Sequence, residues 1–161
     1  MTINKERLLR LASRMEKVKA EHFDIGTWYD PRKVMGFDDL AEKAEFSEDK
    51  ILLREGFCGS VACVLGHAAL IPEFNNQGLG IKVEKGSEGM YPTIVYDGRQ
   101  NTNAGAEFFG LSYMQASLLF GVGGRWREFY TGAWKEITPQ HVAAALRRFV
   151  ETDGESAENY L

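Results

Sequence analysis

The chain has 161 residues, of which 44% are hydrophobic and 26% are charged, and its formal net charge is −4. This length and composition are typical of one globular domain and exclude a collagen-like or disordered chain. The negative net charge argues against a dedicated nucleic-acid-binding protein, because basic residues supply most of the non-specific affinity for phosphates.

The N-terminal region predicts an amphipathic helix over residues 5–22, where hydrophobic residues recur every three or four positions between Lys and Arg. Residues 1–7 lack the pattern of a secretory signal, and no hydrophobic run reaches the ~18 residues that cross a bilayer. Cys58 and Cys63 fall on one expected helix, where a disulfide between them is geometrically poor. We therefore expect a cytoplasmic protein with reduced thiols.

The most hydrophobic segment predicts a central buried helix over about residues 59–71. At about 100° per residue its small side chains gather on one side, while the opposite side is also apolar. A helix that is apolar all round is a buried helix. Pro72 marks its end, because proline disfavours helical geometry in the residue before it.

A small β-hairpin is predicted over about residues 79–96, where alternating and β-branched residues flank a glycine-containing turn. A helix over 102–109 should then end at Gly110. Ser112 is the expected cap of the next helix, with Gln115 at the reciprocal capping-box position.

The last helix is expected to have Thr138 as its cap and Pro139 as its first residue. The predicted fold is α+β, mainly α, with the central helix surrounded by other helices and the hairpin. We expect a single domain over residues 1–161, of which 151–161 form a frayed acidic tail.

Cys58 is the candidate nucleophile, because the start of a helix favours a thiolate. A cysteine at a helix start followed by Gly-Ser occurs in papain-like thiol hydrolases, although the glutamine and tryptophan that flank the papain-type cysteine are absent here. His22 and His141 are the candidate bases from elsewhere in the fold. The alternative interpretation is that Cys58 and Cys63 are small buried thiols in a tightly packed helix.

Cys63 and His67 are four residues apart, so one face of a helix could direct both toward a metal ion. A closed metal site needs four ligands, and the chain holds two Cys and three His in all. We therefore predict no metal site and no cofactor. His67 is interpreted instead as a hydrogen-bonded core or cleft histidine.

Residues 121–134 combine glycines with arginines and aromatic residues, the types that are enriched at binding hot spots. Gly121-Val122-Gly123-Gly124 is not a dinucleotide fingerprint, because no expected strand leads into it. The alternative is a long loop anchored by its own aromatic residues, with the arginines in solvent. The candidate binding residues are Arg125, Trp126, Arg127, Tyr130 and Trp134, together with Trp28 and Tyr29.

Residues 106–119 have the outline of a helix-turn-helix, the basis of an alternative as a nucleic-acid-binding protein. The second helix offers Gln115 to base edges and is otherwise largely apolar. A packing corner between two helices is the simpler interpretation. We therefore regard nucleic acid as an unlikely partner.

Three segments carry a resemblance to other proteins: residues 23–28, the segment Cys58-Gly59-Ser60-Val61-Ala62-Cys63-Val64-Leu65-Gly66-His67-Ala68, and residues 108–112 with 119–120 and 138–143. Together they resemble a group of uncharacterised small bacteriophage and prophage proteins with the pattern Cys-Gly-(Ser/Thr)-x-(Ala/Gly)-Cys-x-x-Gly-(His/Trp). The resemblance implies an accessory role, such as binding a host defence component or its nucleotide signal.

The leading hypothesis is a non-enzymatic binding protein inside a bacterial cell, with a protein partner or an anionic small ligand. A cysteine-dependent hydrolase or transferase is the first alternative. The sequence carries no sign of a membrane partner, and it does not indicate an oligomeric state.

Overall fold

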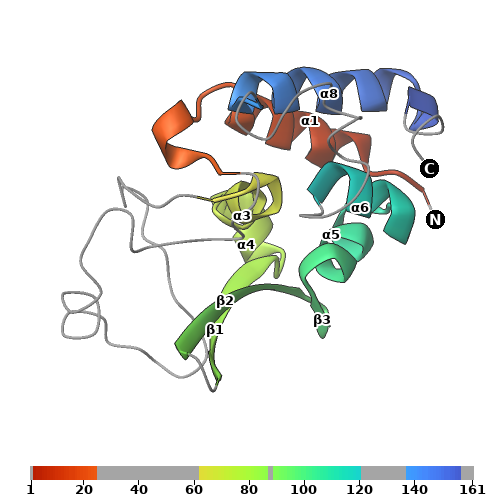
Figure 1. Ribbon diagram of the computed structural model, residues 1–161. Coiled ribbons are helices and arrows are strands. Elements are labelled where there is room, and N and C mark those ends of the chain that lie inside the picture. Colours follow the sequence, from red (N-terminus) through yellow and green to blue (C-terminus); the bar gives the residue numbers. More distant parts are fainter. Residues whose placement is uncertain (1, 25–61, 87–88, 121–136, 157–161) are drawn as a thin grey trace.

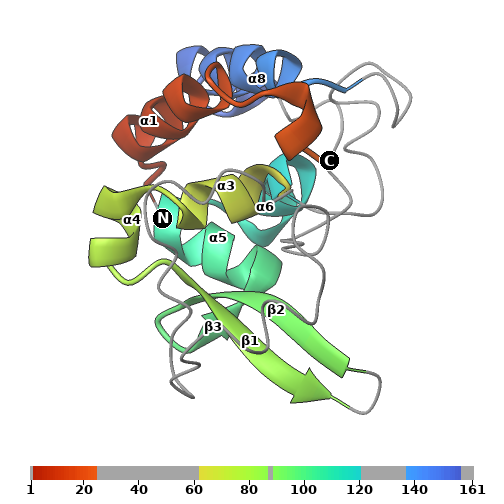
Figure 2. The ribbon, with the colours of Figure 1, turned by 90° about the vertical axis from the view of Figure 1, so that its left-hand side faces the viewer.

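The computed structural model describes residues 2–24, 62–86, 89–120 and 137–156, with the backbone alone for 83–86 and 89–92. These residues confirm the expected α+β fold, which is mainly α. Helices α1 and α8 form one layer. A second layer of helices lies between this pair and a three-stranded antiparallel sheet at the opposite end (Figures 1 and 2).

Helices α1 (Lys5–Met15) and α8 (Pro139–Glu151) lie side by side. The side chain of Asn4 caps α1 by accepting a hydrogen bond from the backbone N–H of Arg7. The helix expected over 5–22 is divided, because Lys17 and Val18 form tighter i→i−3 hydrogen bonds and Lys19 is extended. A short 3-10 helix, η1 (Ala20–His22), then follows.

The expected central helix is present but shorter than predicted. Helix α3 (Val64–Ala69) is buried along its whole length, and it begins at Val64 because Cys63 is extended and Ala62 pairs with Phe23 in an isolated parallel β-bridge. Pro72 does follow the end of this helix. It is also the first residue of α4 (Pro72–Asn76), a helix that the sequence analysis did not predict.

The expected hairpin consists of β1 (Gly80–Gly86) and β2 (Gly89–Tyr96), in antiparallel register from Gly80 opposite Val95 to Gly86 opposite Gly89. The turn after β2 has positive φ angles at Asp97 and Gly98, as a tight two-residue hairpin connection requires. It leads into β3 (Arg99–Gln100), which pairs with the end of β2.

Helices α5 (Asn101–Phe109) and α6 (Tyr113–Phe120) pack against each other, and α6 also packs against α3. Gly110 ends α5 in the left-handed conformation, as predicted. Ser112 and Gln115 form both hydrogen bonds of the expected capping box. The centre of the core is an aromatic cluster whose neighbouring rings are 5.0 to 5.9 Å apart: Phe74, Phe108, Phe109 and Phe120.

The chain beyond α8 is described as far as Ser156. The backbone N–H of Gly154 donates to the carbonyl of Phe149 at 2.8 Å, and the Thr152 hydroxyl accepts from the N–H of Ser156 at 3.0 Å. The first part of the expected tail is thus hydrogen-bonded onto α8, and residues 157–161 lie outside the described residues. Within the described ranges, no helix has the length and hydrophobicity to cross a membrane.

Candidate functional site

Most of the residues predicted to form a site lie outside the part of the chain that the structure describes. They are Cys58, Trp28, Tyr29, Arg125, Trp126, Arg127, Tyr130 and Trp134. The described residues do include His22 and His141, the two candidate bases, and Cys63 and His67 of the central segment. The histidine–cysteine junction, defined as residues 22–24 with Ala62, Cys63 and His67, brings several of these together.

The junction is built on the backbone of His22. Its carbonyl oxygen accepts a hydrogen bond from the N–H of Ala62 at 3.2 Å and lies 2.8 Å from Nε2 of His67. The N–H of Asp24 donates to the carbonyl of Ala62 at 3.2 Å. The two chain positions that flank residues 25–61 are therefore hydrogen-bonded to each other, with His67 beside them.

His67 is a core histidine, as interpreted, with 3% of its surface exposed. Because a carbonyl can only accept, Nε2 carries the proton and donates to His22. Its Nδ1 is buried and has no hydrogen-bond partner among the described residues. The ring stacks on Phe23, with centroids 6.4 Å apart.

Burial lowers the pKa of His67 to about 4, and its electrostatic interactions with Arg14 and His22 act in the same direction. The hydrogen bond to the His22 carbonyl opposes this effect, since it favours a protonated ring. The imidazole of His67 is therefore neutral at pH 7. Its Nε2–H donates to the His22 carbonyl, and the lone pair of its Nδ1 is buried.

Cys63 is the N-cap residue of α3 and is 1% exposed. Burial raises its pKa to about 11, although the backbone N–H groups of Gly66 and Leu65 lower it. At neutral pH the side chain is a thiol, and a thiol is a poor nucleophile. For Cys63 this agrees with the interpretation as a small buried side chain. The prediction for Cys58 remains a prediction, because that residue lies outside the described ranges.

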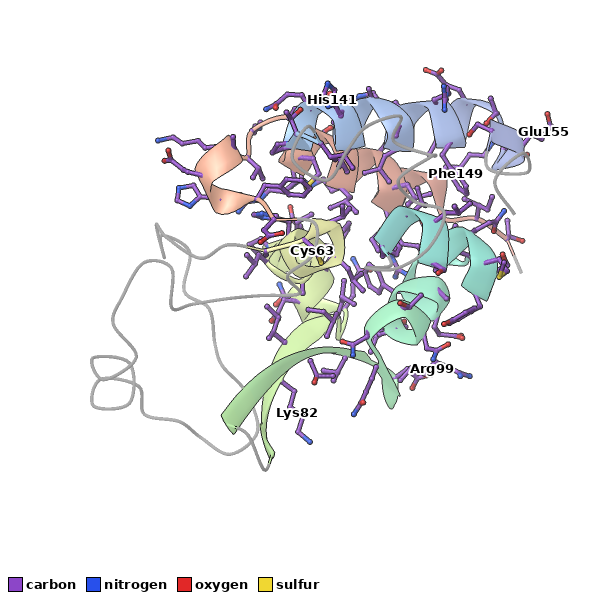
Figure 3. The ribbon with its side chains drawn as sticks, in the orientation of Figure 1. Cys63, Lys82, Arg99, His141, Phe149 and Glu155 are labelled. Carbon is purple, nitrogen blue, oxygen red and sulfur yellow. The ribbon has the colours of Figure 1, made fainter. Side chains whose placement is uncertain are left out.

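The two candidate bases have different surroundings. His141 is exposed, and its Nδ1 accepts a hydrogen bond from the backbone N–H of Thr138 at 3.3 Å. The Thr138 hydroxyl accepts from the His141 N–H at 3.2 Å, which completes a capping box at the start of α8. His22 is half-buried, with its Nε2 3.5 Å from the Glu21 carboxylate. Figure 3 labels Cys63 at α3 and His141 at the start of α8.

Sequence reasoning missed two features of this region. The contribution of His22 to the junction is its backbone carbonyl, and no pattern of side chains encodes that. His141 replaces the glutamate or glutamine that normally completes a capping box, so the usual motif does not reveal it. A Thr-Pro pair followed by a hydrogen-bonding side chain at the third helical position was the available signal.

The described residues contain no cluster of three or more His, Cys, Asp or Glu side chains suited to a metal ion. The pair Cys63 and His67 is therefore not extended to a metal site by any described neighbour. The chemistry that the junction offers is that of a neutral thiol and a neutral imidazole, both held in the core.

Residues 121–136, which contain most of the predicted binding residues, are flanked by two buried side chains. Phe120 ends α6 in the aromatic cluster, and Ile137 precedes the cap of α8. The side chain of Gln140 donates to the carbonyl of Val18 at 3.4 Å. This bond ties the start of α8 to the chain just before η1, and both views show these two segments at one end of the molecule (Figures 1 and 2).

Comparison of the chain with known protein families, with characterised proteins and with solved structures gave no match.

Proposed function

We propose that the chain is a non-enzymatic binding protein of the bacterial cytoplasm, which recognises a protein partner or an anionic small ligand through residues 121–134. Trp28 and Tyr29 would extend the same surface. The observation that carries the proposal is the anchoring of this segment: its flanking residues Phe120 and Ile137 are both buried in the helical core. The described residues on both sides of this arginine- and tryptophan-bearing segment thus form a fixed base.

A fixed base matters for affinity, because ordering the binding residues costs free energy that a rigid scaffold reduces. Binding residues are commonly carried on connections between rigid elements. Trp126 and Trp134 provide aromatic area, while Arg125 and Arg127 have the fork-shaped donors that bind carboxylates and phosphates in a bidentate manner. This chemistry suits an acidic protein surface or a nucleotide.

The resemblance to bacteriophage and prophage proteins adds a biological setting. An accessory protein of this origin would meet a host defence component or the nucleotide signal that activates it. Arg125 and Arg127 would neutralise negative charge on either target. Calorimetry with nucleotides and a pull-down of proteins distinguish the two.

The nucleotide test is calorimetry of the full chain with a panel of linear mononucleotides and cyclic dinucleotides. The protein test is a pull-down from bacterial lysate with the full chain as bait. We expect Trp126→Ala and Arg125→Ala each to weaken the interaction by about tenfold or more. Arg148→Ala, which removes an exposed arginine from the last turn of α8, is the matched control and should bind like the wild type.

Two outcomes would contradict the proposal. If both variants bind like the wild type, residues 121–134 are not the binding site. If the wild type retains neither a nucleotide nor a partner, the binding function itself is wrong.

The thiol enzyme is kept as a second candidate because of one observation at the junction. Ala62 is hydrogen-bonded to His22, and Cys58 precedes Ala62 by four residues. Four extended residues span at most about 14 Å, so His22 is a more natural base for Cys58 than His141, whose ring is engaged in the α8 cap.

Iodoacetamide labelling at pH 7, read by mass spectrometry at each cysteine, tests this candidate. Cys63 is the internal control, because a buried thiol with a pKa of about 11 should react very slowly. A catalytic Cys58 should be alkylated faster than an ordinary exposed thiol, and His22→Ala should abolish that excess. A Cys58 as inert as Cys63 would end the enzymatic alternative.

A further inference from the structure

We propose that protonation of the His67 ring breaks the pairing of residues 22–24 with Ala62 while the surrounding helices stay folded. This inference concerns the histidine–cysteine junction and does not depend on the binding function proposed for residues 121–134. It rests on the hydrogen bonds, burial and charges of the described residues.

The carbonyl oxygen of His22 accepts from two donors. This oxygen accepts from the N–H of Ala62 at 3.2 Å and from Nε2–H of His67 at 2.8 Å, so the imidazole shares its acceptor with the backbone pairing. Phe23, the next residue, stacks on the same ring. A movement of the His67 ring therefore disturbs its hydrogen bond to His22 and its stacking on Phe23, two of the contacts that hold residues 22–24 against the start of α3.

A proton added to His67 binds at Nδ1. Nε2 already carries one, so a second proton binds Nδ1, which is buried and has no hydrogen-bond partner among the described residues. The new N–H has no acceptor among the described residues and lies on a buried positive charge, and both are costly. Rotating the ring into solvent relieves that cost and removes the hydrogen bond to His22.

The two groups that act electrostatically on the ring disfavour its protonation. They are Arg14 of α1 and His22 of η1. Among the described side chains, the other charged and titratable groups on the elements next to α3 and in the junction are Lys5, Glu6, Arg7 and Arg10 of α1, Glu73 of α4, which pairs with Arg10, Tyr113 of α6, Lys82 of β1, Tyr96 of β2, and Asp24 and Cys63.

The junction and the helices differ in how cooperatively they open. The pairing of Phe23 with Ala62 is an isolated bridge outside the sheet, and η1 has no buried residue. Helices α1 and α8, in contrast, bury continuous hydrophobic faces against the core. Local opening of the junction exposes less apolar surface than unfolding of the helices, so it is the cheaper way to hydrate His67.

Amide hydrogen exchange followed by NMR on the full chain tests whether this pairing opens as the pH falls. The exchange rates of Ala62 and Asp24, corrected for the intrinsic effect of pH, report opening, and the amides of Leu11 and Leu146 report the helices. In the open state the ring has an ordinary pKa, so protection is at its maximum above about pH 6.5 and falls toward pH 4. We expect opening to increase on the order of 100-fold across that range, while the two leucine amides stay protected.

His67→Gln separates titration from hydrogen bonding, because glutamine places a nitrogen donor at a similar reach without taking up a proton. We expect its Ala62 amide to be protected equally at pH 7 and pH 4. His141→Gln is the control, and it should keep the pH dependence of the wild type.

Two results would overturn the proposal. One is equal loss of protection at Ala62, Leu11 and Leu146 as the pH falls, which would mean global unfolding. The other is a wild-type His67 ring that titrates near pH 6.5 in ¹⁵N spectra while Ala62 remains protected. The second measurement needs no variant, so it decides the question even if His67→Gln does not fold.

Discussion

The aromatic cluster of the core and the histidine–cysteine junction are held together by different kinds of interaction. In the cluster, Phe109 contacts the rings of Phe74, Phe108 and Phe120, and its own side chain has no exposed surface. In the junction, two backbone hydrogen bonds and one imidazole join η1 to the start of α3. Loss of one contact in the cluster leaves many others, whereas each contact in the junction is a large share of the total.

This difference shows which part of the molecule can respond to its surroundings. Dispersion and apolar burial in the cluster depend little on pH, because none of the four phenylalanines can ionise. The junction depends on the protonation state of His67, which burial keeps neutral. Segments that change state under mild conditions are drawn from the less stable parts of a protein.

Phe109→Ala is expected to have the largest effect, because it leaves a cavity among three other aromatic rings. We expect the free energy of unfolding to fall by about 3–5 kcal/mol, measured by urea denaturation. Tyr113→Ala is the control, since that side chain is 57% exposed, and we expect a change within about 0.5 kcal/mol. A small loss for Phe109→Ala would mean that the cluster is not the main source of stability.

The pH dependence of stability should come next, and its sign follows from the lowered pKa of His67. The unfolded chain takes up the proton near pH 6.5 and the folded chain near pH 4, so the unfolded state binds more protons between these values. Relative to His67→Gln, the wild type should lose on the order of 3 kcal/mol as the pH falls from 6.5 to 4. Urea denaturation of both proteins at several pH values checks this, and parallel curves would contradict it.

Gly110→Ala should have an intermediate effect, and Gly98→Ala provides a matched comparison. Both glycines have positive φ angles, 65° and 73°, which cost alanine about 1 kcal/mol or more. A Cβ at Gly110 would overlap the carbonyl oxygen of Thr2, whereas a Cβ at Gly98 meets nothing within 4 Å. We expect Gly110→Ala to be at least about 1 kcal/mol more destabilising in thermal denaturation. Equal effects would show that the N-terminal residues move aside freely.

Local chemistry explains which parts of the fold the sequence could predict. Gly110 as the end of α5, and Ser112 with Gln115 as the cap of α6, depend on residues within one turn of each other. The hairpin followed in the same way from alternation on both sides of a short turn. Each of these signals is contained in fewer than about twenty consecutive residues.

The start of α3 could not be predicted in this way. Ala62 and Cys63 are small and apolar, which suits a buried helix and a buried extended segment equally well. Their conformation is decided by Phe23, a residue far away in the sequence, through the isolated bridge. The candidate site has the same limitation. His67 was correctly interpreted as a hydrogen-bonded core histidine, but its partner is a backbone carbonyl, which leaves no signature in the amino-acid sequence.

Thr138→Ala should have the smallest effect of the series, and it tests the unusual cap of α8. The variant removes the hydroxyl that accepts from the N–H of His141. We expect a loss of about 1 kcal/mol in the free energy of unfolding, measured by urea denaturation. Ser112→Ala breaks the equivalent bond in the ordinary capping box of α6, so it is the reference. Similar losses would show that histidine completes a capping box as effectively as glutamine does. A clearly smaller loss for Thr138→Ala would mean that Pro139, already fixed in helical geometry, holds the start of α8 without the hydroxyl.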